Sequence, residues 1–202
     1  MASAASHRNK SDRREALVEA AFQQIAERGF EGLRTREVAG RVGLNIATLH
    51  YYFPSKETLI RGVIGHAMQR FRSTLEPHGS PADQLRNHLR AVRKLLREEP
   101  QLGVVMGELA LRSARDQGLA RIMRETNEAW HKTVRGLLHR AAREGFLAAE
   151  LDSDDTASLI VATLTSMTLP TIASAERTDQ ALRQLERMLS ARPAPSRGRS
   201  SR

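Results

Sequence analysis

The stretch TREVAGRVGLNIATLHYYFPSK, residues 35–56, decides the fold of the N-terminal part of the chain. It predicts two short helices joined by a tight turn, because Gly43 suits the left-handed backbone that ends many helices. Thr35 is expected to cap the first helix and Asn45 the second, since their side chains accept hydrogen bonds from free backbone N–H groups. Pro54 ends the second helix. Together these signals predict a helix-turn-helix hairpin.

The second helix of this hairpin has an inner and an outer face. Leu49 and Phe53 lie four residues apart, so both are expected to point inward. The remaining faces carry small, hydroxyl and aromatic side chains: Ile46, Ala47, Thr48, His50, Tyr51 and Tyr52. Such a helix fits the major groove of DNA, where its first residues reach base edges and its flanks meet phosphates. Many helix pairs turn on a glycine without binding anything, so spacing alone leaves a purely structural hairpin equally open.

A further helix is expected to complete a three-helix unit over residues 11–54. It should begin near Ser11 or Asp12 and end at Gly29. Apolar spacing predicts a shared core of Leu17, Phe22, Ile25, Phe30, Leu33, Val38, Leu49 and Phe53. Residues 1–10 are small and polar, which indicates a disordered arm. Four bases lie in or beside this arm: Arg8, Lys10, Arg13 and Arg14. They could follow a DNA backbone or enter a minor groove, but a solvated tail is the favoured interpretation.

The run GLNIATLHYYFPSKETL, residues 43–59, strongly resembles the recognition-helix signature of TetR-family transcriptional regulators. In that signature Thr-Leu, two or three aromatic residues, Phe and Ser-Lys-Glu follow one another, and the resemblance covers about residues 12–64. It implies a DNA-binding protein in which Thr35 and Arg36 open the first helix of the hairpin and face the duplex. It also implies further contacts: Asn45, Ile46, Ala47 and Thr48 at base edges, and His50, Tyr51, Tyr52 and Lys56 around phosphates.

Two positions depart from the usual pattern of that family. Position 46 is often polar or small, so Ile46 is expected to read DNA only by apolar contact, for example with a thymine methyl group. His50 and Tyr51 stand in the inverse of the more usual order, which leaves open which of them meets phosphate.

The rest of the chain predicts helices only, about nine in all, so the expected fold class is all-α. A helix over 55–75 should connect the DNA-binding unit to an effector-binding and dimerisation domain, residues 55–191. Further helices are expected over 82–98, 101–114 and 116–144, from 152 or 153 with a kink at Pro170, and from Thr178. Residues 192–202 have the composition of a disordered basic tail.

The last two helices are amphipathic, and two copies of them would form a four-helix bundle that buries their apolar stripes. The resemblance implies the same arrangement, because TetR-like regulators pair through their last two long helices. The interface candidates are Leu159, Leu164, Leu182, Leu185 and Leu189. Two recognition helices about 34–36 Å apart read half-sites one turn apart, so the operator should be a near palindrome. The alternative is that both helices pack only within their own chain.

The family also implies a small-molecule pocket in the second domain, whose occupation releases DNA. Candidate lining residues combine apolar bulk with some polarity: His66, Phe71, Leu102, Met106, Leu109, Met123, Thr126, Trp130, Leu138, Thr163 and Met167. Flexible leucine and methionine side chains suit an aliphatic or flexible ligand. Taken one by one, ordinary core positions are the commoner explanation of these residues. Trp130 is the strongest candidate, because a bulky ring with a polar N–H often lines a cavity.

Composition narrows the classes of function. The chain of 202 residues has no cysteine, which excludes disulfides and thiolate metal sites. No apolar run approaches the roughly 20 residues of a membrane span, and the polar N-terminus is no signal peptide, so we expect a cytoplasmic protein without a membrane partner. The net charge of +9 is concentrated near the two ends of the chain, and nucleic-acid binders often show such a charge.

We expect no cofactor, no metal and no enzymatic activity, because no nucleophile elbow, phosphate-binding loop or His-Glu metal helix occurs. His131 and His139 share a helix face near Glu128, but the intervening Arg135 favours a solvated face over a zinc site. The expected function is a dimeric repressor that an unknown, largely apolar small molecule releases from a DNA operator. The alternatives are a sequence-tolerant architectural DNA-binding protein without an effector, and a helical enzyme or lipid-binding module.

Overall fold

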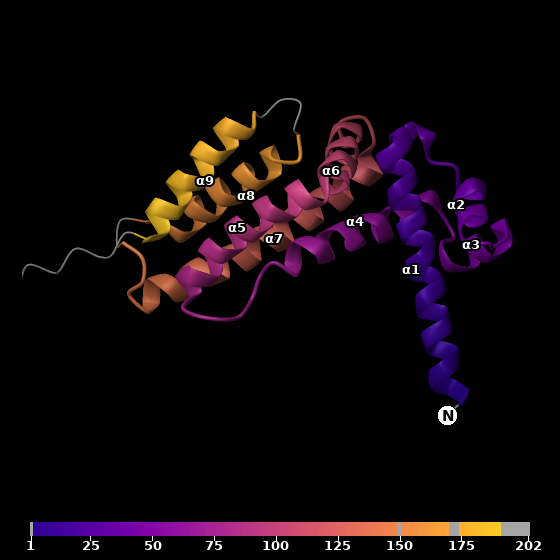
Figure 1. Ribbon diagram of the computed structural model, residues 1–202, viewed down its shortest axis with the longest axis horizontal. Coiled ribbons are helices and arrows are strands. Elements are labelled where there is room, and N and C mark those ends of the chain that lie inside the picture. The colour runs from indigo at the N-terminus through magenta and orange to yellow at the C-terminus, as the bar shows by residue number, and fades with distance from the viewer. Residues whose placement is uncertain (1, 149–150, 170–173, 191–202) are drawn as a thin grey trace, which may run out of the picture. The chain divides into compact units, whose positions relative to one another are not determined.

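The computed structural model describes residues 2–148, 151–169 and 174–190. Within these ranges every regular element is a helix, nine α-helices and one short 3-10 helix, which confirms the all-α class (Figure 1). Contacts divide the chain into two compact units. The first comprises residues up to 72 together with 99–124, and the second comprises residues 73–98 together with those from 125 onward.

The first unit contains the helices that present the candidate DNA-binding surface. Its elements are α1 (Ala2–Arg28), η1 (Phe30–Gly32), α2 (Thr35–Arg41), α3 (Ile46–Tyr52), α4 (Lys56–Arg72), α6 (Pro100–Ser113) and the beginning of α7 (Gln117–Arg143). Helix α1 is central, since it packs against α2, α4 and α6. All eight core positions predicted for the three-helix unit are buried, from Leu17 and Ile25 at 0% exposed to Phe30 at 7%. The apolar spacing therefore identified this core correctly.

Helix α1 differs from the expectation at its start. It begins at Ala2, not near Ser11, so residues 2–10 are helical where a disordered arm was predicted. No proline or glycine interrupts the chain between Ala2 and Arg28, and the alanines near its start favour a helix. Asp12 therefore lies inside the helix and caps nothing. The predicted kink at Pro170 and the predicted tail over 192–202 lie outside the described residues.

The second unit is also helical. It contains α5 (Pro81–Glu98), the remainder of α7, α8 (Ser153–Ser166) and α9 (Ala175–Ser190). As expected, Asp152 caps α8 and accepts hydrogen bonds from two backbone nitrogens at 2.8 and 2.9 Å. Helix α9 starts one turn before the predicted Thr178, because the Ser174 hydroxyl accepts a hydrogen bond from the Arg177 backbone nitrogen at 3.3 Å.

Helices α5 and α9 pack together within the second unit. Arg90 on α5 lies 3.1 Å from Glu186 on α9, and Arg93 forms an ion pair with Asp179. The leucines of α9 are buried in the same unit.

The functional division of the chain remains a prediction. By contacts, α4 and α6 group with the N-terminal helices, whereas the expected DNA-binding part covered 11–54 and the effector part 55–191. Among the described helices, none combines the length and the apolar composition that a bilayer crossing requires.

Candidate nucleic-acid interface

The turn between α2 and α3 is built on Gly43, as predicted. Its φ of +67° is a backbone conformation that other residues adopt only with strain. The backbone nitrogen of Leu44 donates to the carbonyl oxygen of Ala39 at 2.9 Å, which closes the end of α2. The chain then reverses direction sharply enough for a second short helix to follow at once.

Asn45 begins α3, and its role as a cap is confirmed. Its side-chain oxygen accepts hydrogen bonds from the Thr48 backbone nitrogen at 2.8 Å and from the Thr48 hydroxyl at 3.0 Å. These bonds fix the first turn of α3 and orient the Thr48 side chain along it. Helix α3 therefore has a well-defined start.

The prediction that Thr35 caps α2 is wrong. Thr35 is the first helical residue, and Arg34 occupies the cap position without a side-chain hydrogen bond of its own. The capping bond comes instead from Gln24 on α1, whose side-chain oxygen accepts from the Arg34 backbone nitrogen at 2.8 Å. Gln24 also donates to Glu37 at 2.9 Å and is fully buried. It positions the start of α2, and no local sequence signal marks it.

Helix α3 is anchored by two side chains and presents the others. Leu49 and Phe53 are each only 1% exposed, which confirms their predicted inward orientation. The side chains predicted to reach base edges or phosphates are exposed or half-buried: Thr35, Arg36, Asn45, Ile46, Ala47, Thr48, His50, Tyr51, Tyr52 and Lys56. The structure thus places all ten on one compact unit, with no member buried.

The aromatic pair at the end of α3 is accessible. Tyr51 is 67% exposed, and its ring meets that of Tyr52 edge-on at a centroid distance of 5.2 Å. Lys10 reaches this pair from α1, with its ammonium nitrogen 3.0 Å from the Tyr51 hydroxyl oxygen. Lys10 was expected on a solvated tail, so this contact was not predicted. The uninterrupted run from Ala2 to Arg28 is the signal that could have revealed it.

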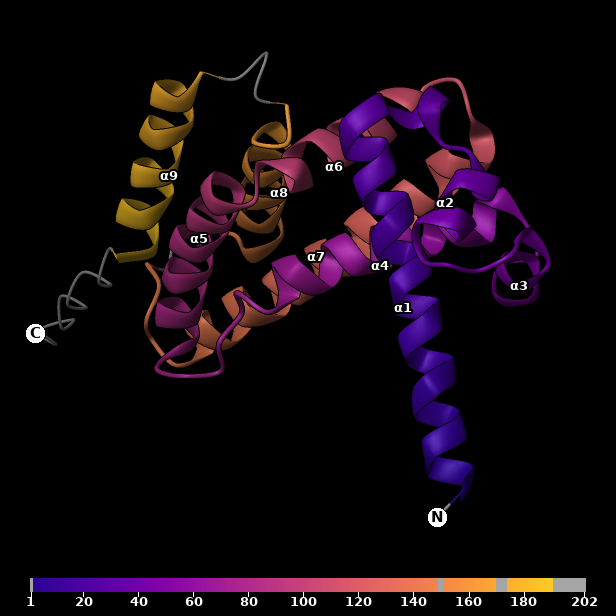
Figure 2. The same ribbon diagram turned by 45° about the vertical axis from the view of Figure 1, so that its right-hand side comes forward.

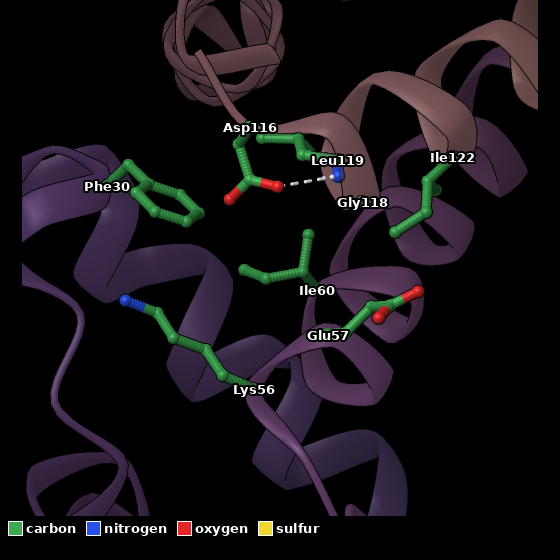
Figure 3. A pocket seen from close by; sticks show the side chains of 8 residues that line it. All are labelled: Phe30, Lys56, Glu57, Ile60, Asp116, Gly118, Leu119 and Ile122. Carbon is green, nitrogen blue, oxygen red and sulfur yellow. Dashed lines mark hydrogen bonds between the residues drawn. The ribbon is translucent and has the colours of Figure 1, made fainter.

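Lys56 opens α4 beside a small cavity (Figure 3). Its ammonium group lies 4.5 Å from the centroid of the Phe30 ring, so among the described residues it makes a cation–π contact with that ring. The cavity has a volume of about 230 Å³ and is lined by Phe30, Lys56, Glu57, Ile60, Asp116, Gly118, Leu119 and Ile122. The two acids of this lining already have partners: Asp116 accepts from the Leu119 backbone nitrogen at 3.0 Å, and Glu57 accepts from Arg121 at 3.1 Å. Lys56 therefore keeps a charge that a phosphate can use.

Two arginines of the first unit are neutralised by carboxylates. Arg28 pairs with Glu37 at 2.6 Å, and Arg41 pairs with Glu27 at 2.5 Å. The hydrogen bond from Arg41 lowers the pKa of the Glu27 carboxyl below its usual value. These arginines hold α1 and α2 together, and they contrast with Lys10 and Lys56, whose described partners are aromatic.

Helix α6 also supports this unit. The Glu108 carboxylate accepts a hydrogen bond from the Phe30 backbone nitrogen at 3.1 Å, and Arg112 pairs with Glu31 at 2.5 Å. Gly29, with a φ of +69°, brings η1 close to that carboxylate. The turn between α1 and α2 is therefore tied to a helix far away in the sequence.

The predicted ligand-pocket residues fall in both units. The first unit contains His66, Phe71, Leu102, Met106, Leu109 and Met123, and the second contains Thr126, Trp130, Leu138, Thr163 and Met167. Phe71, Leu102, Leu109 and Leu138 are buried at 3% exposed or less, as core residues are. The His66 Nε2 atom lies 3.0 Å from the Glu19 carboxylate, and the His66 ring centroid lies 5.4 Å from that of Phe22. The pocket stays a prediction.

The predicted dimer-interface leucines are mostly buried within their own chain. Leu164, Leu182, Leu185 and Leu189 are at most 4% exposed, because they pack within their own chain. Leu159 alone of the five is exposed, at 46%. These four side chains serve the core of the second unit, and amphipathic spacing could not distinguish that core from an interface.

The histidines weighed as zinc ligands have other neighbours. His131 shares a hydrogen bond with the Ser158 hydroxyl at 3.0 Å, and Arg135 donates to His139 at 3.3 Å. Among the described residues, no cluster of three or more metal-ligating side chains occurs.

Comparisons with known proteins identify the class. Residues 17–63 match the family model described as bacterial regulatory proteins of the tetR family. Residues 75–185 match the tetracyclin repressor-like C-terminal domain. Since the second model alone covers more than half of the chain, the chain belongs to the TetR family and is a DNA-binding transcriptional regulator.

Several individual relatives support this assignment. The transcriptional repressor KstR2 of Mycobacterium tuberculosis is 26% identical over 148 residues, covering 71% of this chain and 74% of that protein. The nucleoid occlusion factor SlmA of Pasteurella multocida is 27% identical over 140 residues, covering 67% of this chain and 70% of its own. A TetR regulator structure from Chloroflexus aurantiacus superimposes with a TM-score of 0.74 at 25% identity, covering 93% of this chain and all of the other. A TetR-family structure from Rhodococcus sp. gives a TM-score of 0.80 at 24% identity, over 89% of this chain and 100% of that one.

Proposed function

We propose that this regulator is a dimeric repressor that reads a near-palindromic operator through α3 and leaves it when a small, largely apolar ligand binds. The division of α3 into two faces carries the proposal. Leu49 and Phe53 anchor the helix, while its first turn from Ile46 to Thr48 stays accessible. The first turn is the part of a recognition helix that reaches base edges in the major groove.

The chemistry of that first turn limits what it reads. Ile46 and Ala47 offer apolar surface, which suits a thymine methyl group. The Thr48 hydroxyl donates to Asn45 at 3.0 Å, so the Thr48 side chain has less rotational freedom. Arg36, exposed in the first turn of α2, supplies the donor pair that recognises guanine edges. We therefore infer half-sites that combine a guanine with neighbouring thymines.

A selection on random duplexes tests this reading. The wild type should enrich two inverted half-sites one helical turn apart, and Arg36→Ala should change which bases are enriched. Arg124→Ala, at an exposed arginine on α7, is the matched control and should enrich the same sequence. If Arg36→Ala weakens binding equally on all DNA sequences, Arg36 contacts a phosphate and not a base edge. Equal affinity of the wild type for random and selected DNA would favour the architectural alternative.

The dimer rests on the outer surfaces of α8 and α9. The buried leucines of these helices are used within the chain, but Leu159 remains as an exposed apolar side chain on α8. A monomer with one recognition helix contacts a single half-site, so palindromic readout requires a second copy. The similarity to the repressor KstR2 supports repression as the direction of control.

An unsatisfied polar atom in the second unit supports the proposal that a ligand binds there. His88 on α5 is fully buried, and its Nε2 atom makes no hydrogen bond to any described residue. Its Nδ1 atom lies 2.7 Å from the Thr74 hydroxyl oxygen, and its ring meets that of Trp130 edge-on at 6.0 Å. A buried polar atom without a partner costs about 1–3 kcal/mol, and a ligand hydroxyl or amide would remove this cost. We infer a mostly apolar ligand with one polar group.

Trp130 offers a direct assay of this ligand, because it is the chain's one tryptophan. Its fluorescence can be followed while a homologous series of alcohols and fatty acids is added to the protein bound to a dye-labelled operator. A supporting result is a shift in fluorescence together with loss of operator anisotropy, both weakened in His88→Phe. Full operator retention across the series and across fractionated cell extract would contradict ligand release.

A further inference from the structure

The first turns of α1 extend the first unit beyond its packed core. Residues 9–16 are all exposed, whereas burial begins at Leu17. Figures 1 and 2 show this part of α1 running past the neighbouring helices α2 and α3. Lys10, Arg13 and Arg14 lie on it, so a continuous helix carries three bases where a disordered arm was expected.

Two of these bases contact the aromatic end of α3. The Lys10 ammonium nitrogen lies 3.0 Å from the Tyr51 hydroxyl oxygen and 5.0 Å from the centroid of that ring. The Arg14 guanidinium lies 5.0 Å from the centroid of the Phe53 ring. The recognition helix and the start of α1 therefore share one surface, although Lys10 and Tyr51 are 41 residues apart in sequence.

The chemistry of this contact leaves donors available. An ammonium group has three N–H bonds, and one of them is used when Lys10 donates to Tyr51. The Tyr51 oxygen then accepts, and its own O–H remains able to donate. A charged donor and a neutral donor thus stand side by side on an exposed surface, and a phosphate group presents two oxygens that accept hydrogen bonds.

We propose that Lys10 and Tyr51 together clamp one phosphate of the DNA backbone, which makes the first turns of α1 part of the DNA interface. The inference rests on the proposed use of α3 as the recognition helix. It assigns Tyr51, and not His50, as the aromatic phosphate contact. It also makes α1 a second positioning element that fixes the register of α3 on the duplex.

The contrast with neighbouring cations supports this assignment. Arg28 and Arg41 are neutralised by carboxylates, whereas the described partner of Lys10 is a phenol that leaves its charge intact. The hydrogen bond with Tyr51 raises the pKa of the Lys10 ammonium, so the group stays charged. A lysine held in place with its full charge loses less side-chain freedom when it meets a phosphate than a lysine on a flexible tail.

Salt-dependent binding of Lys10→Gln, Tyr51→Phe and the double variant to the selected operator tests the clamp. Lys10→Gln should weaken binding roughly tenfold and reduce the slope of log K against log salt by about 0.9 for each subunit bound. Tyr51→Phe should weaken binding about threefold at an unchanged slope. The double variant should lose less than the product of the two single losses, because the groups share one phosphate.

Lys132→Gln, at an exposed lysine on α7, is the matched control and should change neither affinity nor slope. Circular dichroism confirms that each variant folds. An unchanged slope in Lys10→Gln overturns the proposal, and so does a neutral Tyr51→Phe. A wild type that binds no duplex with sequence preference would instead overturn the proposed function, so the two failures are distinguishable.

Discussion

The buried side-chain oxygen of Gln24 lies 2.8 Å from the backbone nitrogen of Arg34 and accepts the hydrogen bond that begins α2. Gln24 belongs to α1, so the helix that opens the DNA-binding hairpin is capped by a different helix. The same side chain donates to Glu37 at 2.9 Å, and Glu37 pairs with Arg28 of α1. One amide group therefore joins α1 to the start of α2, beside the ion pairs that also hold the two helices together.

Replacing Gln24 by leucine should test that connection. Leucine has a similar size but leaves the Arg34 backbone nitrogen without its partner, so the free energy of unfolding should fall by about 1–2 kcal/mol. Urea denaturation followed by circular dichroism measures the change. Gln23→Leu is the control, because Gln23 is half-buried on the same helix and donates only to Glu19. Equal losses in the two variants would remove the special role of Gln24.

Lys56 should contribute to DNA affinity without contributing to sequence preference. Lys56→Ala removes one cation from beside the Phe30 ring, and the salt slope should decrease by about 0.9 for each subunit bound. Binding should weaken alike on selected and random duplexes, since a phosphate contact carries no base information. Fluorescence anisotropy over a range of salt concentrations measures both quantities. A salt slope equal to that of the wild type would show that Lys56 does not contact a phosphate.

The proposed dimer predicts different behaviour for two exposed leucines. Leu159 on α8 is 46% exposed and Leu111 on α6 is 64% exposed. Leu159→Glu should weaken self-association about tenfold or more, because burying a leucine at an interface is worth about 1.5–3 kcal/mol and a carboxylate there adds a desolvation cost. Leu111→Glu should leave self-association unchanged. Sedimentation equilibrium gives both values, and equal dimer affinity in the two variants would move the interface away from Leu159.

His88 should make stability depend on pH. Burial lowers the pKa of His88 to about 4, whereas the unfolded chain titrates near the ordinary value of 6.5. Between these values the unfolded state binds more protons, so the free energy of unfolding falls as the pH falls. The expected loss from His88 is about 2 kcal/mol between pH 7 and pH 5.

The measurement is urea unfolding at both pH values, followed by Trp130 fluorescence. His88→Leu should lose this part of the pH dependence, while His78→Leu, at an exposed histidine, should retain it. An identical pH dependence in the wild type and in His88→Leu would show that other groups cause it.

The local signals in the sequence were the most informative. Gly43, Asn45 and Asp152 act as turn and cap residues where the sequence indicated, because a cap bonds to atoms two or three residues away. The core of the three-helix unit was predicted completely, because helix periodicity alone assigns an inward face. The accessible positions of α3 followed from the same reasoning.

The contacts between distant segments were not visible in the sequence. Gln24 replaces Thr35 as the source of the cap on α2, and Lys10 meets Tyr51 across 41 residues, because each pair is brought together only when α1 packs on the hairpin. The four inward leucines of α8 and α9 show the same limit, since an amphipathic stripe looks identical whether it faces its own chain or a second copy. Helix spacing and capping chemistry thus determined, from the sequence by itself, that this protein is all-helical and contains a helix-turn-helix hairpin. The resemblance of residues 43–59 to the TetR-family signature then indicated a DNA-binding regulator. Only the tertiary structure decided which helix faces are buried inside the chain and which stay exposed for DNA. The physical reason is that burial depends on packing partners that no local sequence pattern specifies.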